Sequence, residues 1–158
     1  MIVKEIRDED FTSYKKPSMV IGFPSCTFKC EREYGQKMCQ NSALATSPDI
    51  DISIKDIVDR YLQNPITKAI IFAGLEPMDS WNDMINLIDE FRKYTEDEII
   101  VYTGYYMDEI CTKTYWLGNK YKNLIFKFGR FIPNQQPHYD NILGINLASN
   151  NQYAERIS

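Results

Sequence analysis

The sequence lacks the features that nucleic-acid-binding and membrane proteins usually show. Its 158 residues carry 18 Lys and Arg against 22 Asp and Glu, a net charge of −4, whereas nucleic-acid-binding domains are usually basic. No apolar run approaches the roughly 18 residues of a membrane-spanning helix. The N-terminal residues turn acidic too early for a signal peptide. We therefore expect a cytoplasmic protein with no nucleic-acid and no membrane partner.

Linkers, internal repeats and low-complexity segments are also missing. The chain has only seven glycines and seven prolines, and no Gly-, Ser- or Pro-rich run is long enough to separate domains. Its hydrophobic content of 44% suits a globular core. A chain of this length can bury about 70% of its unfolded surface without disulfides. Residues 1–158 are therefore expected to form a single domain.

Short apolar runs alternate with helical periodicity along the chain. Strands are predicted over residues 18–23, 68–73, 98–102, 123–128 and 142–147, and helices over 53–62, from 80 onward and over 108–117. This alternation favours parallel βαβ units, whose loops after the strands meet at one ligand-binding edge. Five or six units cannot close an eight-stranded barrel. The predicted fold is α/β, a partial (β/α) barrel with about five to six mostly parallel strands.

Cysteine is scarce but clustered. Three of the four cysteines, Cys26, Cys30 and Cys39, follow the first predicted strand within fourteen residues. In a reducing compartment such clustering favours metal or redox chemistry over disulfides. Thiolates select Zn²⁺, Cu(I) or iron–sulfur clusters. Three protein ligands would leave one coordination position for another group.

The fourth ligand distinguishes the metal alternatives. Structural zinc sites are closed by four ligands, often in C-x2-C pairs, which this loop lacks. The single histidine, His138, could complete a zinc site but lies far along the chain. Cys111 falls within a predicted helix, where we expect it to be buried as a small apolar residue. A [4Fe–4S] cluster normally takes four cysteines, so three would leave one iron open.

One stretch of the C-terminal half is locally basic. Because lysine and arginine are mostly exposed, we interpret it as solvated surface rather than as a binding site. Its members are Lys113, Lys120, Lys122, Lys127 and Arg130.

The cysteine loop resembles the cluster loop of radical S-adenosylmethionine (SAM) enzymes. Cys26-x3-Cys30 follows a predicted strand, as in the common C-x3-C-x2-C pattern of that superfamily. Here eight residues separate Cys30 from Cys39, so residues 31–37 must loop out if the three thiols share a cluster. Cys39-Gln-Asn41 is similar to the C-x-N continuation of the small activating enzymes in this superfamily.

Later segments extend the resemblance over nearly the whole chain. Phe72–Pro77 resembles the Gly-Gly-Glu-Pro turn that receives the methionine amino group, with Leu75 in place of one glycine. Val101–Tyr105 is similar to the Tyr-Thr-Gly-Tyr segment of the anaerobic ribonucleotide reductase activating proteins. Gly129–Ile132 and Leu147–Gln152 resemble the Gly-Arg-Phe and Ser-Ser-Asn-Gln elements of the same family.

This resemblance implies a reaction. Cys26, Cys30 and Cys39 would hold a [4Fe–4S] cluster, and SAM would bind its open iron. An electron from the cluster would cleave SAM into methionine and a 5′-deoxyadenosyl radical. That radical would take a hydrogen atom from a glycine of a large glycyl-radical enzyme, here an anaerobic ribonucleoside-triphosphate reductase. An external donor such as flavodoxin or ferredoxin would reduce the cluster, and no catalytic side chain is implied beyond the cluster.

The resemblance also implies contacts to SAM. Gly74 and Glu76 would present carbonyls and a carboxylate to its ammonium group. Met38 would lie against adenine or pack within the loop, and Thr103 would donate a hydroxyl to the ligand or stabilise a turn. Residues 143–145 would line the adenine site or pack in the core. Two alternatives stay open: another small radical SAM enzyme acting on a different peptide or small molecule, and a non-catalytic zinc or iron–sulfur domain.

Overall fold

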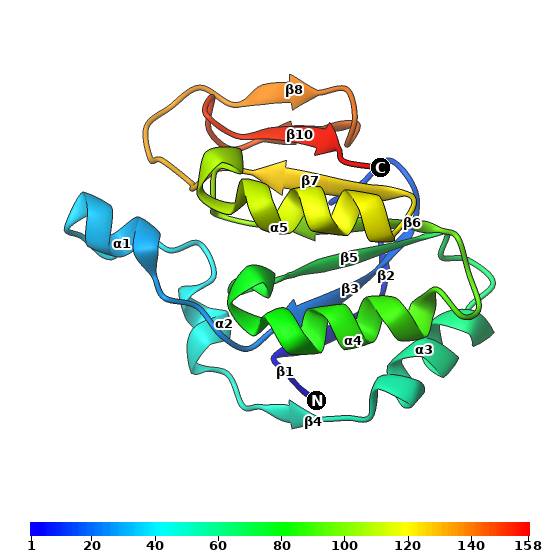
Figure 1. The fold of residues 1–158 in the computed structure, drawn as a ribbon. Helices are drawn as coiled ribbons and strands as arrows, with labels where there is room; N and C mark the ends of the chain where they lie inside the picture. The colour runs from blue at the N-terminus through cyan, green and yellow to red at the C-terminus, as the bar shows by residue number, and fades with distance from the viewer.

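The computed structural model describes all 158 residues, and its centre is a six-stranded sheet with the order β10-β7-β6-β5-β3-β2 (Figure 1). Two edge strands, β2 (Glu5–Asp10) and β10 (Tyr153–Arg156), pair antiparallel with their neighbours. Between them run four parallel strands: β3 (Ser18–Phe23), β5 (Ala69–Gly74), β6 (Glu98–Tyr102) and β7 (Leu124–Phe128). The fold is mixed α/β with an open, mostly parallel sheet, and the partial barrel stays a prediction.

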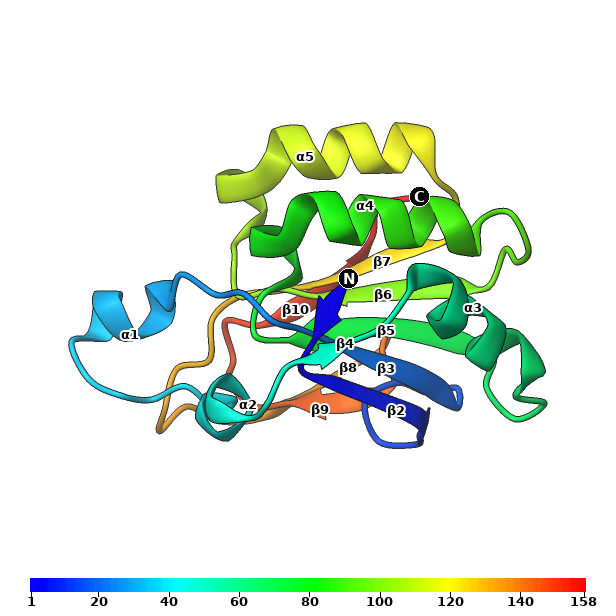
Figure 2. The ribbon, with the colours of Figure 1, turned by 90° about the horizontal axis from the view of Figure 1, so that it is seen from below.

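Helices cover one face of this sheet (Figure 2). They are α3 (Ile54–Gln63), α4 (Trp81–Phe91) and α5 (Met107–Lys120). Alternate strand residues such as Phe23, Phe72 and Phe126 point into this larger core and are fully buried. Because the parallel strands are covered on both faces, their sequences are continuously apolar rather than alternating.

The other face is covered by loops and a hairpin. Tyr14, Leu143 and Leu147 pack there against strand residues that include Val20 and Ile71. The hairpin consists of β8 (His138–Asp140) and β9 (Ile145–Leu147), which pair with each other and not with the main sheet.

The predicted fifth strand over residues 142–147 is therefore wrong in its first half, and its second half belongs to the hairpin. Asp140 Oδ1 accepts the backbone N–H groups of Ile142 and Leu143, each at 2.9 Å. These bonds hold a turn, so only Ile145–Leu147 is extended. The edge strands β2 and β10 were not predicted because their sequences contain no continuous apolar run.

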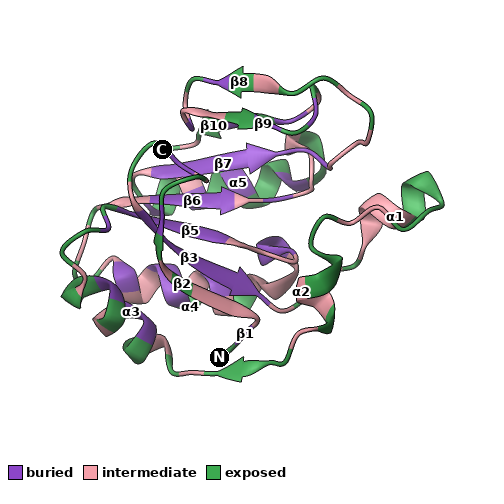
Figure 3. Cartoon of the chain, turned by 180° about the vertical axis from the view of Figure 1, so that it is seen from behind, coloured by how far each residue is buried: buried purple, intermediate pink, exposed green.

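The remaining elements are short. The insert between the second and third clustered cysteines contains most of α1 (Lys29–Tyr34), followed by α2 (Ser42–Thr46). A two-residue pair, β1 (Ile2–Val3) with β4 (Ile50–Asp51), joins the N-terminus to the segment after α2. In Figures 1 and 3, α1 projects from the body, with exposed and half-exposed residues along its length. No helix is long and apolar enough to cross a lipid bilayer.

Gly118 in α5 packs closely against the C-terminal segment. A Cβ at Gly118 would lie 2.4 Å from the carbonyl oxygen of Ile157. Ala in place of Gly within a helix normally stabilises by about 0.5–1 kcal/mol, but this clash reverses the expected sign. Gly118→Ala should therefore lower the free energy of unfolding by about 1–3 kcal/mol, as measured by urea denaturation. Thr112→Ala, at an exposed site of α5, should be neutral or slightly stabilising, and stabilisation by Gly118→Ala would contradict the packing.

Candidate functional site

A cavity of about 400 Å³ opens at the carboxyl ends of the parallel strands. The parallel register brings the loops after β3, β5, β6 and β7 to this edge. Of the predicted adenine wall, Ile145 lines the cavity, whereas Leu143 is buried in the core. The other residues predicted to bind the cluster or SAM all line it: Cys26, Cys30, Met38, Cys39, Gly74, Glu76 and Thr103.

The three clustered cysteines are free and half-buried. Cys26 Sγ accepts the backbone N–H of Phe28 at 3.2 Å. Burial raises the pKa of the Cys26 thiol to about 12, and burial together with nearby Cys39 raises the pKa of Cys30. Metal binding requires deprotonated thiols. A soft, positively charged metal group would therefore be needed to keep these cysteines deprotonated.

The three cysteines line the cavity but do not converge on one point. No three His, Cys, Asp or Glu side chains lie close enough together to hold one metal ion. In a [4Fe–4S] cluster each cysteine binds its own iron, so the donor set fits a cluster better than a closed zinc site. The fourth zinc ligand considered above, His138, lies in β8 and does not line the cavity. Cys111 is exposed on α5, so its predicted burial is wrong.

A buried carboxylate joins the ends of β5 and β6. Glu76 Oε1 accepts the hydroxyl of Thr103 at 2.8 Å, and Oε2 accepts the N–H of Gly104 at 2.8 Å. The N–H of Met78 also donates to Oε1, at 3.1 Å. Glu76 is only 5% exposed, and burial raises its pKa to about 7. Thr103 thus stabilises a turn, and both oxygens of Glu76 already have protein partners.

The cysteine loop is tied to the end of β5 through Asn41. Its side-chain Nδ2 donates to the carbonyl oxygen of Gly74 at 2.6 Å. Gly74 has a φ of +92°, and a Cβ there would lie 2.5 Å from the backbone nitrogen of Phe23. Only glycine permits this close approach of two strand ends. The contact holds the chain two residues after Cys39, so the third cysteine stays at the cavity.

Two residues of the basic stretch are buried, which corrects the expectation of solvated surface. Lys127 lies in β7, and its Nζ donates to the carbonyl oxygen of Gly129 at 2.9 Å. Burial lowers its pKa to about 8. Arg130 is also buried beside the cavity. A lysine within the apolar run Leu124–Phe128 is the sequence signal that could have identified this site. The other members are exposed as predicted: Lys113, Lys120 and Lys122.

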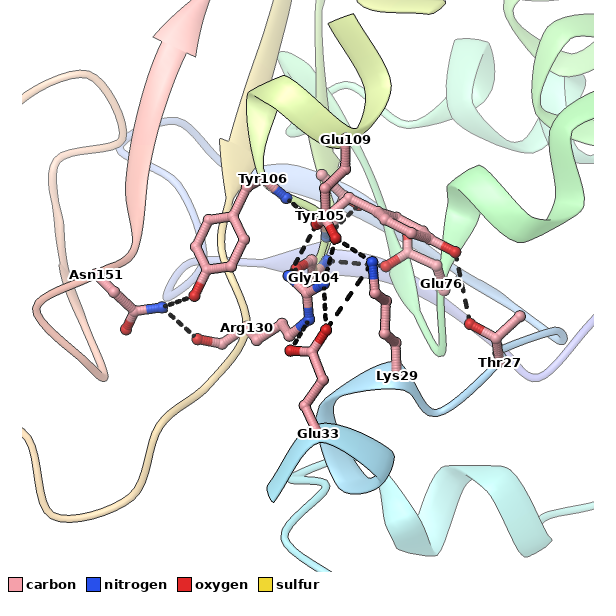
Figure 4. A network of polar contacts seen from close by, with 11 residues as sticks. Thr27, Lys29, Glu33, Glu76, Gly104, Tyr105, Tyr106, Glu109, Arg130 and Asn151 are labelled. Carbon is pink, nitrogen blue, oxygen red and sulfur yellow. Dashed lines mark hydrogen bonds and ion pairs between the residues drawn. The ribbon is translucent and has the colours of Figure 1, made fainter. Parts of the chain in front are cut away.

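Arg130 is the centre of an ionic network (Figure 4). Its guanidinium binds Glu109 through two hydrogen bonds of 2.8 and 2.5 Å. Arg130 Nη2 also donates to Glu33 Oε1 at 3.0 Å, and Lys29 pairs with Glu109. Burial would raise the pKa of Glu109, but hydrogen bonds from Arg130 and Lys29 lower it to about 2. The ring of Tyr106 lies 4.8 Å from the guanidinium carbon.

The C-terminal segment supports this network. Asn151 Nδ2 donates to the carbonyl oxygen of Arg130 at 2.7 Å and to the hydroxyl of Tyr106 at 2.9 Å. Arg130 Nη1 in turn donates to the carbonyl oxygen of Gly104 at 3.2 Å. Hydrogen bonds therefore connect the cysteine loop with the loops after β6 and β7 and with Asn151 in the C-terminal segment.

Because Glu76 is buried, we expect the stability of the protein to depend on pH. Because the folded-state pKa of Glu76 is raised from 4.5 to about 7, folding favours the protonated form. This contribution to stability is complete below about pH 4.5 and is lost as the pH rises through 7. Relative to Glu76→Gln, the free energy of unfolding should fall by on the order of 3 kcal/mol between pH 4.5 and 7.5. Urea denaturation of the reduced apo-protein measures this, and parallel pH profiles would contradict it.

Comparison with known proteins indicates which cofactor the protein binds. A family model described as a 4Fe-4S single cluster domain matches residues 18–150, from the start of β3 to Asn150, just before β10. No curated protein and no solved structure matches the chain. The match covers the cysteine loop and most of the cavity, and it identifies an iron–sulfur protein with a [4Fe–4S] cluster as its cofactor. The chain therefore belongs to the family of 4Fe-4S single cluster domains.

Proposed function

We propose that this iron–sulfur protein is a radical SAM activase that generates a glycyl radical on an anaerobic ribonucleoside-triphosphate reductase. The observation that carries the proposal is a cavity with three clustered cysteines and no fourth. With three thiolates, one iron of the cluster has no protein ligand. A volume of about 400 Å³ is within the usual range for a small-molecule site, which supports a ligand such as SAM in this cavity.

In this proposal Cys26, Cys30 and Cys39 hold the cluster. When bound, the reduced cluster would supply the electron that cleaves SAM, and the nucleoside fragment would take a hydrogen atom from the partner's glycine. The protein's own contribution is to orient these groups and to exclude side reactions. Because reduction of a sulfonium needs a potential near the low end of the iron–sulfur range, an external donor such as flavodoxin or ferredoxin would supply the electron.

Charged groups in the cavity are complementary to the amino-acid part of SAM. The ammonium of Lys127 has one protein acceptor, which leaves two N–H groups for a carboxylate. Glu76 accepts three hydrogen bonds from the protein, and a carboxylate has about four acceptor positions. The remaining position and the carbonyl of Gly74 would receive the ammonium group of SAM. Met38 and Ile145 offer apolar contact for adenine.

The open site favours a protein substrate. The cavity opens to the surface at the end of the sheet, so a loop of another protein can reach it from outside. A sheet curved into the partial barrel predicted from the sequence would leave its mouth free for a glycine-bearing loop. This is the reason to prefer a large glycyl-radical enzyme in the cytoplasm as the partner over a free peptide or a small molecule.

SAM cleavage and the ligand set can be tested together. The protein, reconstituted anaerobically with iron and sulfide and reduced with dithionite, should release 5′-deoxyadenosine from SAM, as measured by chromatography. Cys39→Ala should lose most of the cluster absorbance and at least 100-fold of the activity, because one iron loses its thiolate. Cys111→Ala is the matched control and should behave as the wild type, since Cys111 is exposed outside the cavity. A colourless zinc protein, or a cluster that is inert toward SAM, would exclude the proposal.

The partner requires a separate experiment. Incubation of the reduced protein and SAM with an anaerobic ribonucleoside-triphosphate reductase should give the doublet of a glycyl radical by electron paramagnetic resonance (EPR). The doublet should be missing when Cys39→Ala replaces the wild type. Release of 5′-deoxyadenosine without any doublet would point to the alternative, another small radical SAM enzyme with a different substrate.

A further inference from the structure

The insert between Cys30 and Cys39 is held to the body by charge rather than by apolar packing. Its helix α1 has no buried residue. Two side chains one turn apart on α1, Lys29 and Glu33, reach the pair formed by Arg130 and Glu109 (Figure 4). The only helix that reaches into the insert is thus attached through an ionic network.

The geometry of the network depends on arginine. The guanidinium of Arg130 binds Glu109 through Nη1 and Nη2, and on its other side Nη2 donates to Glu33 Oε1 at 3.0 Å. Arg130 Nε also lies 3.0 Å from Glu33 Oε2. A planar fork with five N–H groups can bind two carboxylates at once, whereas a lysine ammonium offers only a point charge. Arg130 therefore connects α5 to α1.

The helix α1 determines the positions of two of the three cysteines, Cys30 and Cys39. Cys30 lies within α1, and Glu31 Oε1 accepts the backbone N–H of Cys39 at 3.2 Å. The first cysteine, Cys26, is held differently: the next residue, Thr27, donates its N–H to Asp79 Oδ2 at 2.7 Å. Movement of α1 would therefore shift two of the sulfurs relative to the first.

We propose that Arg130 is a positioning residue for the cluster. Through Glu33 it fixes α1, and α1 places Cys30 and Cys39 at their distances from Cys26. Eight intervening residues make the closed loop longer than a two-residue spacing does, and a longer loop loses more entropy when its ends are brought together. The ionic network offsets this cost. The proposal rests on the three-cysteine ligand set proposed above but not on SAM cleavage, because it concerns the cluster alone.

A chelation experiment tests this role on the cluster-loaded protein. The rate of iron release to a ferrous chelator is measured under anaerobic conditions at 50 and 500 mM salt. In the wild type the rate should rise several-fold with salt, because ion pairs with an exposed partner are screened. Glu33→Gln should release iron several-fold faster at low salt and respond little to added salt. Since Glu33 is half-exposed, this variant should fold, unlike a truncation of buried Arg130.

The matched control is Asp59→Asn, which removes one carboxylate from the exposed Lys55–Asp59 pair on α3. It should release iron at the wild-type rate and keep the wild-type response to salt. A second readout is the EPR spectrum of the reduced cluster, whose g values should change in Glu33→Gln and not in Asp59→Asn. The melting temperature of the apo-protein should be similar in all three proteins.

The outcomes separate this proposal from the one on which it rests. A wild-type release rate, salt response and EPR spectrum in Glu33→Gln would overturn the role of Arg130. A lower melting temperature of that variant without a change at the cluster would also overturn it, in favour of a purely structural contact. A normal cluster in Cys39→Ala would instead show that the ligand set is wrong.

Discussion

The arrangement of the site depends on one buried carboxylate, that of Glu76. It holds the end of β5 against the end of β6 through Thr103 and Gly104. Arg130 then binds the carbonyl of Gly104 from the next strand end. Leaving any of these buried polar groups without its partner would cost on the order of 1–3 kcal/mol. The strand ends are therefore held in position by side chains and backbone groups of the protein itself.

The central strands could be predicted because burial on both faces makes them continuously apolar. Residues 18–23 and 98–102 were predicted with the bounds that the structure has. The edge strands β2 and β10 carry charged residues, because one of their faces meets solvent, and so lack that signal. Residues 142–147 look like a strand, but Asp140 folds the first half into a turn. The deciding side chain lies just before the apolar run, and the pattern of the run itself does not contain it.

In the site, too, residues in local motifs could be predicted, and contacts between distant segments could not. The cysteines, Gly74 and Glu76 could be found because they lie in short motifs directly after predicted strands, and a parallel sheet brings such loops together. The ion pair of Arg130 with Glu33 was not predicted, because Glu33 is distant in sequence and becomes a neighbour of Arg130 only in the fold. Lys127 was assigned to the surface from its residue type, although its apolar neighbours in β7 indicate burial. A single sequence does not show which charged residues form pairs between distant parts of the chain.

The position of α1 connects the unusual cysteine spacing with the rest of the site. Figure 3 shows α1 projecting from the body. An apolar contact would fix α1 equally well, but it would place a hydrophobic surface at the mouth of the cavity, which Lys29 and Cys30 of α1 line. Exposed apolar patches of that kind promote unspecific association. A network of Lys29, Glu33, Glu109 and Arg130 keeps the mouth polar, and both signs of charge are balanced within it. In the proposed function this lets a partner's loop approach the cluster while the cysteines stay in place.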